Sequence, residues 1–379
     1  SSPHSPHGNR DDRENPKWGD AHPYHVWVHN QPLEWFRTSR HRFLSEFGME
    51  AFPHPRTLAS CLPKEAQELN HPLIETSHQF AKRGTSRMLG YVLDWFRLPK
   101  DYESGLWLTQ IMQGFTLQYA VEHWRRLMPH TMGTLYWQLN DCWPTASWAT
   151  IDYNGRWKAA QYMARRFFAP VHVTAIENLV GNYGKEDVGL AAINDSGANI
   201  QAVLEWRIFT PDGKLIAKGR QPKRLAARKV ANFRKIPLPG IMKKHPLQEL
   251  LFSLELRTSK GQVLSRNGWT MVPPRLINLM DPEFKIRTYL SDSGRACVEL
   301  TVRRPALYVW LDLAEADARF SDNFFHLFPG QKVILEITAS SDLTLAEIRR
   351  QLRCRSLVDT YRRGEYDNLP ASDAREQIK

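Results

Sequence analysis

The periodicity of the hydrophobic residues changes near Pro170, and this change constrains the fold more than any other feature of the sequence. Before Pro170, apolar residues recur at helical spacing, most clearly in 104–128, a stretch that Pro129 ends. After Pro170, apolar and polar residues alternate in short runs such as 200–208, which is the period of half-buried strands. We therefore predict an α/β part followed by all-β domains.

The α/β part is predicted from two short apolar segments that alternate with helical stretches. Residues 42–48 and 133–139 have the pattern of short buried strands, and helical patterns occupy 56–70, 75–97, 104–128 and 157–168. The order strand, helices, strand, helix is typical of repeated β/α units. Residues 1–27, rich in Pro, His and charge, are predicted to form a long loop over a surface or cleft.

The all-β part is predicted to contain two immunoglobulin-like β-sandwiches. Short strand patterns separated by turn sequences such as Pro211-Asp212-Gly213 favour this architecture. Pro273-Pro274 is predicted to be a linker between the sandwiches. The expected domains are residues 1–169, 170–273 and 280–352, followed by a loose charged tail at 353–379.

Composition excludes several classes of protein. The 379 residues are 42% hydrophobic and 24% charged, which is typical of a globular chain with a core and excludes disorder over most of its length. The four cysteines lie far apart, without disulfide or metal-ligand spacing, and this favours a reducing compartment. No apolar run approaches the roughly 20 residues that cross a bilayer.

The formal net charge of +11 is concentrated in one region. Residues 213–248 contain eleven Lys or Arg and no Asp or Glu, which equals the whole excess. Such a strip can bind a polyanion or can be the solvated face of a small β domain. We favour the second interpretation because only Phe233 supplies an aromatic ring for base stacking within it.

Two segments carry residues suited to chemistry. Glu46 lies among apolar residues at the end of the first predicted strand, where β/α barrels place catalytic groups, although a structural Glu bound to a neighbouring Arg has the same pattern. The second strand runs into Trp137, Asn140, Asp141 and Trp143. Aromatic planes beside amide and carboxylate groups suit a sugar, and core packing of the tryptophans is the alternative.

A third group of polar residues precedes both strands. Asp20, His22 and His25 could be taken for metal ligands, but their spacing matches no known metal template. We interpret them instead as part of a polar wall beside a cleft.

These stretches together resemble the β-mannosidases of glycoside hydrolase family 2. The resemblance covers roughly residues 1–350 and rests on Gly19-Asp20-Ala21-His22, on Arg42 to Gly48, on Gly133 to Pro144, on the run from Ala146 to Lys158, and on Ser321 to Gly330. It implies the C-terminal part of a (β/α)8 TIM barrel, about strands six to eight, followed by the two sandwiches. It also implies that Glu46 is the nucleophile of a retaining mechanism, and no cofactor or metal.

The resemblance also places residues around the sugar. Trp137 would lie near the pocket floor, and Asn140, Asp141 and Trp143 would line the rim or hold the loop. Asp20, His22 and Tyr24 would border the same pocket. The family's acid/base is the Glu of an Asn-Glu pair, and no such dipeptide occurs in this sequence. We therefore expect a chain that begins near the sixth barrel strand, and expect it to be inactive alone.

The expected substrates are β-mannoside oligosaccharides or glycoconjugates, without a nucleic-acid or membrane partner. The expected location is intracellular, cytoplasmic in a bacterium and lysosomal in an animal. The oligomeric state is left open. Three alternatives remain: a family 2 β-galactosidase or β-glucuronidase, a carbohydrate-binding protein without hydrolysis, and a nucleic-acid binder that uses the basic strip.

Overall fold

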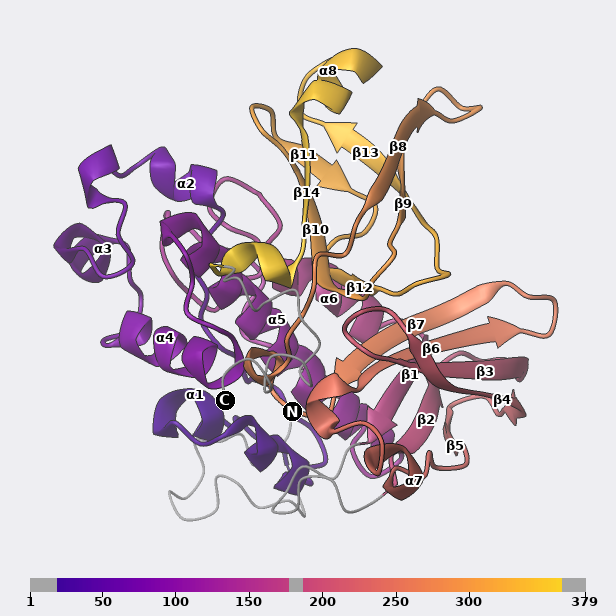
Figure 1. Cartoon of the computed structure of the whole chain (residues 1–379). Helices are drawn as coiled ribbons and strands as arrows, with labels where there is room; N and C mark the ends of the chain where they lie inside the picture. Colours follow the sequence, from indigo (N-terminus) through magenta and orange to yellow (C-terminus); the bar gives the residue numbers. More distant parts are fainter. Residues whose placement is uncertain (1–18, 177–186, 363–379) are drawn as a thin grey trace, which may run out of the picture.

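The computed structural model describes residues 19–176 and 187–362, which form a helical part and two β-sandwiches (Figure 1). The helical part, coloured indigo to purple, surrounds the long helix α5, and both sandwiches pack beside it (Figure 1). The expected loop at 1–27 falls within the described residues only from position 19 onward. None of the helices in the described ranges is long and apolar enough to span a membrane.

The helical part contains one long helix and several short ones. In chain order they are α1 (His25–His29), η1 (Leu33–Thr38), α2 (Pro55–Ala59), η2 (Lys64–Ala66), α3 (Pro72–Ser77), α4 (Gly84–Trp95), α5 (Tyr102–Arg126) and α6 (Ala159–Phe167). The patterns at 104–128 and 157–168 are confirmed by α5 and α6. The pattern at 56–70 is divided into α2 and η2, because Pro63 has no N–H to continue the first helix. The pattern at 75–97 is interrupted between the end of α3 and the start of α4, where Gln79 forms a bridge to Ala146.

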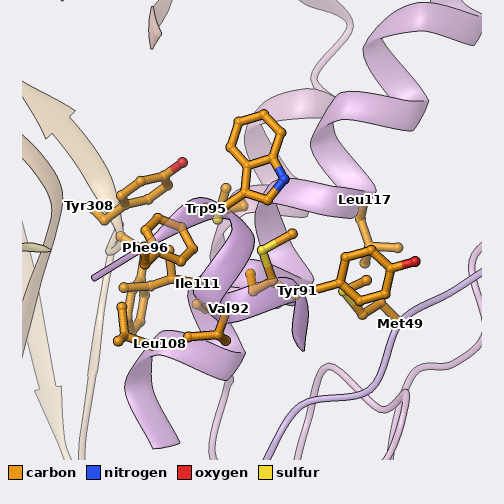
Figure 2. Packing of buried hydrophobic residues seen from close by; sticks show 14 of the residues in the cluster. Met49, Tyr91, Val92, Trp95, Phe96, Leu108, Ile111, Leu117 and Tyr308 are labelled. Atoms are coloured by element: carbon orange, nitrogen blue, oxygen red, sulfur yellow. The ribbon is translucent and has the colours of Figure 1, made fainter. Parts of the chain in front are cut away.

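Helix α5 organises the core of this part. It begins where the Asp101 carboxylate accepts a hydrogen bond from the Ser104 amide at 2.8 Å, an N-cap that satisfies a free helix donor. The helix is buried almost all round, as expected of a central helix. Figure 2 shows Leu108, Ile111 and Leu117 of α5 within the same hydrophobic cluster as Tyr308 of the second sandwich.

The two predicted barrel strands are present only as isolated bridges. Leu44 forms a parallel bridge to Ala21 on one side and to Thr134 on the other. The strand predictions at 42–48 and 133–139 are therefore wrong in extent, because a regular parallel ladder needs continuous pairing and these segments pair at single residues. Three parallel segments still lie next to one another, in the order 21, 44, 134.

The first sandwich has two antiparallel sheets. One has the order β1 (Val171–Ile176), β2 (Gly189–Asn194), β5 (Lys229–Asn232), and the other β4 (Leu215–Leu225), β3 (Ile200–Phe209), β6 (Leu251–Thr258), β7 (Val263–Thr270). Short helices α7 (Pro239–Met242) and η3 (Leu247–Glu249) precede β6. Residues 251–256 of β6 are buried on both faces, although the sequence alternates, because the polar face carries Glu255 bound to Arg257 and Arg266.

Four of the eleven basic residues of the strip, Lys218, Arg220, Lys223 and Arg224, lie on β4, which is an edge strand of its sheet. Most of its side chains are exposed or half-buried, and Lys223 donates to the main-chain carbonyl of Asn232. Charged residues on an edge strand discourage pairing with another chain. The placement favours the interpretation as a solvated face.

The second sandwich also has two antiparallel sheets. They are β12 (Phe325–Leu327), β10 (Ala306–Leu313), β14 (Leu352–Arg355), and β11 (Ala318–Phe320), β13 (Val333–Ala339), β9 (Ala296–Thr301), β8 (Lys285–Leu290). Helices η4 (Pro274–Leu276), α8 (Leu345–Gln351) and η5 (Leu357–Thr360) complete the chain.

The sandwich continues beyond the predicted boundary at 352. β14 pairs with β10, and Leu357 and Val358 of η5 are buried in the core of the helical part. The expectation of a loose tail from 353 is therefore wrong for residues 353–362, because apolar side chains among the charges find a core to enter. Residues 363–379 lie outside the described ranges.

Candidate active site

Glu46 lies on the middle of the three parallel segments, and its side chain reaches solvent with 28% of its surface exposed. The Tyr24 hydroxyl donates a hydrogen bond to Glu46 Oε1 at 2.8 Å. His22 Nδ1 lies 3.7 Å from Glu46 Oε2. Among the described residues, the partners given for the carboxylate are thus the Tyr24 hydroxyl, which is hydrogen-bonded to it, and the neighbouring His22 imidazole, rather than the arginine that the structural alternative supposed.

Tyr24 is held in its neutral form. Burial, the hydrogen bond to Glu46 and the charge of that carboxylate together raise the pKa of the Tyr24 hydroxyl far above its usual range. The Tyr24 hydroxyl keeps its proton, and it donates this proton in the hydrogen bond to the Glu46 carboxylate. The contact therefore orients the carboxylate and leaves Oε2 toward His22.

The segment that contains Asp20 and His22 lies directly beside the Glu46 segment. Ser45 Oγ donates to Asp20 Oδ2 at 2.5 Å, and the amide of Ser45 donates to the Ala21 carbonyl at 3.2 Å. The second carboxylate oxygen of Asp20 is buried and has no hydrogen-bond partner among the described residues. The predicted proximity of Asp20, His22 and Tyr24 to Glu46 thus agrees with the structure, while their role toward a sugar stays a prediction.

Trp137 lies on the third parallel segment, on the other side of the Glu46 segment. Its amide donates to the carbonyl of Phe47 at 2.8 Å, and 43% of its side chain is exposed. The peptide bond from Trp137 to Gln138 is cis. Gly48 permits this close approach, because a Cβ there would lie 2.2 Å from the Trp137 carbonyl oxygen.

Exposed apolar side chains lie on two of the three parallel segments. Leu135, Trp137 and Leu139 of the third segment are exposed, and Phe43 of the middle segment is exposed as well. Trp137 is therefore one of several apolar residues in this region that the described residues do not bury.

The loop after Trp137 divides into exposed and buried residues. Asn140 is exposed, and its side-chain Nδ2 donates to the carbonyl of Asp141 at 3.4 Å. Trp143 stacks on Phe80 with ring centroids 5.2 Å apart. Asp141 is turned inward, only 7% exposed, and accepts a hydrogen bond from Ser147 Oγ at 2.6 Å. Of the two roles predicted for Asp141, its placement favours holding the loop over lining the pocket rim.

Three buried polar residues behind the site were not predicted from the sequence. Glu50, Lys158 and Gln113 are fully or almost fully buried. Gln113 donates to the carbonyl of Met49 and Lys158 to that of Ala51, both on the segment that follows Glu46, and Glu50 accepts from the Ala81 amide. Glu50 follows Glu46 by four residues, and Lys158 is the last residue of the run from Ala146 to Lys158 that carries part of the family resemblance. Nothing in the local pattern distinguishes a buried Lys from an exposed one, so only the run itself could have drawn attention to it.

The residues considered as metal ligands do not form a metal cluster. Within the described ranges, no group of three or more His, Cys, Asp or Glu is placed to hold an ion. His25 instead stacks on Trp35 with ring centroids 4.1 Å apart.

Comparison with known proteins identifies both sandwiches. Residues 186–275 match the model of a mannosidase Ig/CBM-like domain, and residues 279–360 match that of an Ig-fold domain of mannosidases. Over 365 residues the chain is 28% identical to a β-mannosidase of Capra hircus, covering 91% of this chain and 40% of that protein. It is 38% identical over 175 residues to β-mannosidase B of Aspergillus clavatus, covering 45% and 21%.

Solved structures agree with these similarities. A β-D-mannosidase from Dictyoglomus thermophilum superposes with a TM-score of 0.83 at 26% identity, covering 93% of this chain and 42% of that one. An exo-chitosanase from Amycolatopsis orientalis, at 16% identity and a TM-score of 0.69, shares the fold and covers 90% of this chain and 45% of its own.

These similarities relate the chain to glycoside hydrolases. More narrowly, it is a relative of the β-mannosidases of glycoside hydrolase family 2. It spans about two fifths of the length of the Capra hircus relative.

Proposed function

We propose that Glu46 is the nucleophile of a retaining β-mannosidase and that this chain supplies one side of its sugar pocket. The observation that carries the proposal is the accessible Glu46 carboxylate, held by Tyr24 and adjoining the segment of the exposed Trp137. In this mechanism one Glu46 oxygen bonds to the anomeric carbon of a terminal β-mannose, the aglycone oxygen leaves with a proton, and water then releases mannose.

The fixed groups around Glu46 fit this role. The neutral Tyr24 hydroxyl holds Oε1, so that Oε2 is the oxygen available for attack. Trp137 offers an aromatic plane on which the apolar face of a sugar ring can stack. Asp20, His22 and the exposed Asn140 are the groups we assign to the sugar hydroxyls.

Retention requires a second carboxyl group about 5–5.5 Å from the nucleophile to act as acid and then base. We propose that it comes from polypeptide outside these 379 residues, because the family's Asn-Glu motif does not occur in them. The exposure of Phe43, Leu135 and Leu139, three apolar residues on the segments of Glu46 and Trp137, supports this, since further strands of a (β/α)8 barrel could cover them.

The test uses the protein that carries the complete barrel. Glu46→Ala should remove nearly all hydrolysis of p-nitrophenyl β-D-mannoside, and azide or formate should restore part of it by replacing the missing nucleophile. A panel of β-mannoside, β-galactoside and β-glucuronide substrates identifies the sugar. Unchanged turnover in Glu46→Ala would eliminate the assignment.

The 379-residue chain alone is the second arm of the test. We expect it to show no turnover, because it lacks the acid/base motif. Mannoside hydrolysis by the chain alone would refute the proposal that the acid/base lies outside it. Mannose binding without turnover by the complete protein would favour the carbohydrate-binding alternative.

A further inference from the structure

A buried clamp lies behind the two segments that bear Glu46 and Trp137. Past Glu46 the chain continues to Ala51, and past Trp137 it folds back to Ser147. Ala51 and Ser147 form an antiparallel bridge with N–H···O bonds of 2.9 and 3.2 Å in both directions. This bridge is where the main chain of the nucleophile segment meets the loop that follows Trp137.

Lys158 binds both sides of this bridge. Its Nζ donates to the carbonyl of Ala51 at 3.0 Å and to the carbonyl of Ser147 at 3.3 Å. The side chain is completely buried, so the ammonium has left water to make these bonds. Burial lowers the pKa of Lys158, while the carboxylates of Asp141 and Asp152 act in the opposite direction.

Gln113 makes a second connection between the same two segments. Its Nε2 donates to the carbonyl of Met49 at 2.8 Å and to that of Trp148 at 3.0 Å. Gln113 belongs to the long helix α5 and is completely buried. The rigid central helix is therefore tied to the backbone on both sides of the site.

The clamp is connected to Trp137 by main-chain hydrogen bonds. The amide of Gln138 donates to the Trp148 carbonyl at 3.2 Å, and the amide of Trp137 donates to the Phe47 carbonyl at 2.8 Å. A shift of residues 147–149 would thus move the peptide that follows Trp137. Burying the Lys158 ammonium and the Gln113 side-chain amide costs free energy. Hydrogen bonds to main-chain carbonyls of these two segments offset part of that cost.

We propose that Lys158 and Gln113 are positioning residues, which fix the Glu46 segment against the Trp137 loop by binding main-chain carbonyl groups of both. The inference deepens the proposed function, on which its kinetic arm rests. Neither side chain touches the sugar. A nucleophile that is misplaced by about 1 Å can lose about 100-fold in rate, and the clamp prevents such a displacement.

The kinetic arm uses the complete protein and compares Lys158→Met and Gln113→Met with a control, Arg125→Met. Arg125 is also a largely buried cation that donates to main-chain carbonyls, those of Phe167 and Ala169, but these lie at the end of α6 and just after it, away from the Glu46 and Trp137 segments. We expect kcat per folded molecule to fall about 10- to 100-fold in the two clamp variants, with a smaller change in KM, and to stay near wild type in the control. Equal effects in all three variants would overturn the proposal.

A second arm does not depend on catalysis and uses the 379-residue chain. Amide hydrogen exchange is measured at Ala51, Trp137, Gln138 and Ser147, whose N–H groups form the bonds described above. Exchange should accelerate at these amides in Gln113→Met and not in Arg125→Met. Gln113→Met keeps this arm decisive should Lys158→Met fail to fold, because it removes no charge.

The two arms separate the possible failures. Unchanged exchange at all four amides in Gln113→Met overturns the clamp, whatever the protein catalyses. Accelerated exchange together with an active Glu46→Ala supports the clamp as a connection between the segments and removes only the proposed function.

Discussion

The buried carboxyl group of Glu50 should make the stability of this protein depend on pH. Glu50 is 1% exposed, one carboxylate oxygen accepts from the Ala81 amide at 3.2 Å, and the other accepts no hydrogen bond from the part of the chain that the structure describes. Burial raises the pKa of Glu50 from its ordinary 4.5 to about 8, and the nearby Asp141 acts in the same direction. Lys158, Arg87 and the Ala81 amide oppose the shift but do not cancel it.

The consequence for stability follows from linkage. Between pH 4.5 and 8 the folded protein keeps the Glu50 proton that the unfolded chain has released. The free energy of unfolding therefore falls as pH rises, by about 1.4 kcal/mol per pH unit from this group. At pH 7 the accumulated cost is about 3 kcal/mol relative to acid conditions.

Glu50→Gln removes the titrating group and keeps the shape of the side chain. Urea unfolding, followed by tryptophan fluorescence at pH 5, 6, 7 and 8, gives the free energy for both proteins. The difference between variant and wild type should grow in favour of the variant by about 1.4 kcal/mol per pH unit, whatever constant offset the amide introduces. Glu75→Gln, which removes an exposed carboxyl on α3, is the matched control. Parallel stability curves for Glu50→Gln and wild type would refute the reasoning.

Two further predictions concern close contacts. Gly48→Ala should destabilise the protein by about 1–3 kcal/mol, because the added Cβ would lie 2.2 Å from the Trp137 carbonyl oxygen. Gly90→Ala should stabilise it by about 0.5–1 kcal/mol, because the added Cβ on α4 meets open space and alanine favours a helix more than glycine does. Thermal unfolding measures both, and equal signs would contradict the prediction. Asp317→Asn should speed hydrogen exchange in β11, because the partly exposed Asp317 carboxylate joins the second sandwich to Arg56 and Arg156. The free energy of opening β11 should fall by about 1 kcal/mol. Unaltered exchange would count against this prediction.

Periodicity and turn sequences determined the broad organisation of this chain. Pro129 does follow the end of the long helix α5, and the alternation after Pro170 does correspond to antiparallel strands. These features depend on neighbours within one turn or one strand, so local sequence is sufficient. The Ser-Glu-Phe-Gly and Trp-Gln-Leu-Asn-Asp runs also led to Glu46 and Trp137, which the structure brings onto adjacent segments.

Tertiary contacts decided what those local patterns could not. Residues 42–48 and 133–139 look like strands, but a parallel ladder requires partners along its length, and single bridges are what these segments form. Asp141 and Asn140 are neighbours in a promising run, yet one is buried against Ser147 and the other is exposed. The burial of Lys158 could not be predicted from its neighbours in the sequence. The cost of removing its ammonium group from water is offset by carbonyls and carboxylates that belong to other segments of the chain. Sequence determines which chemistry the chain carries, and the packing of distant segments around α5 decides which of those groups reach solvent.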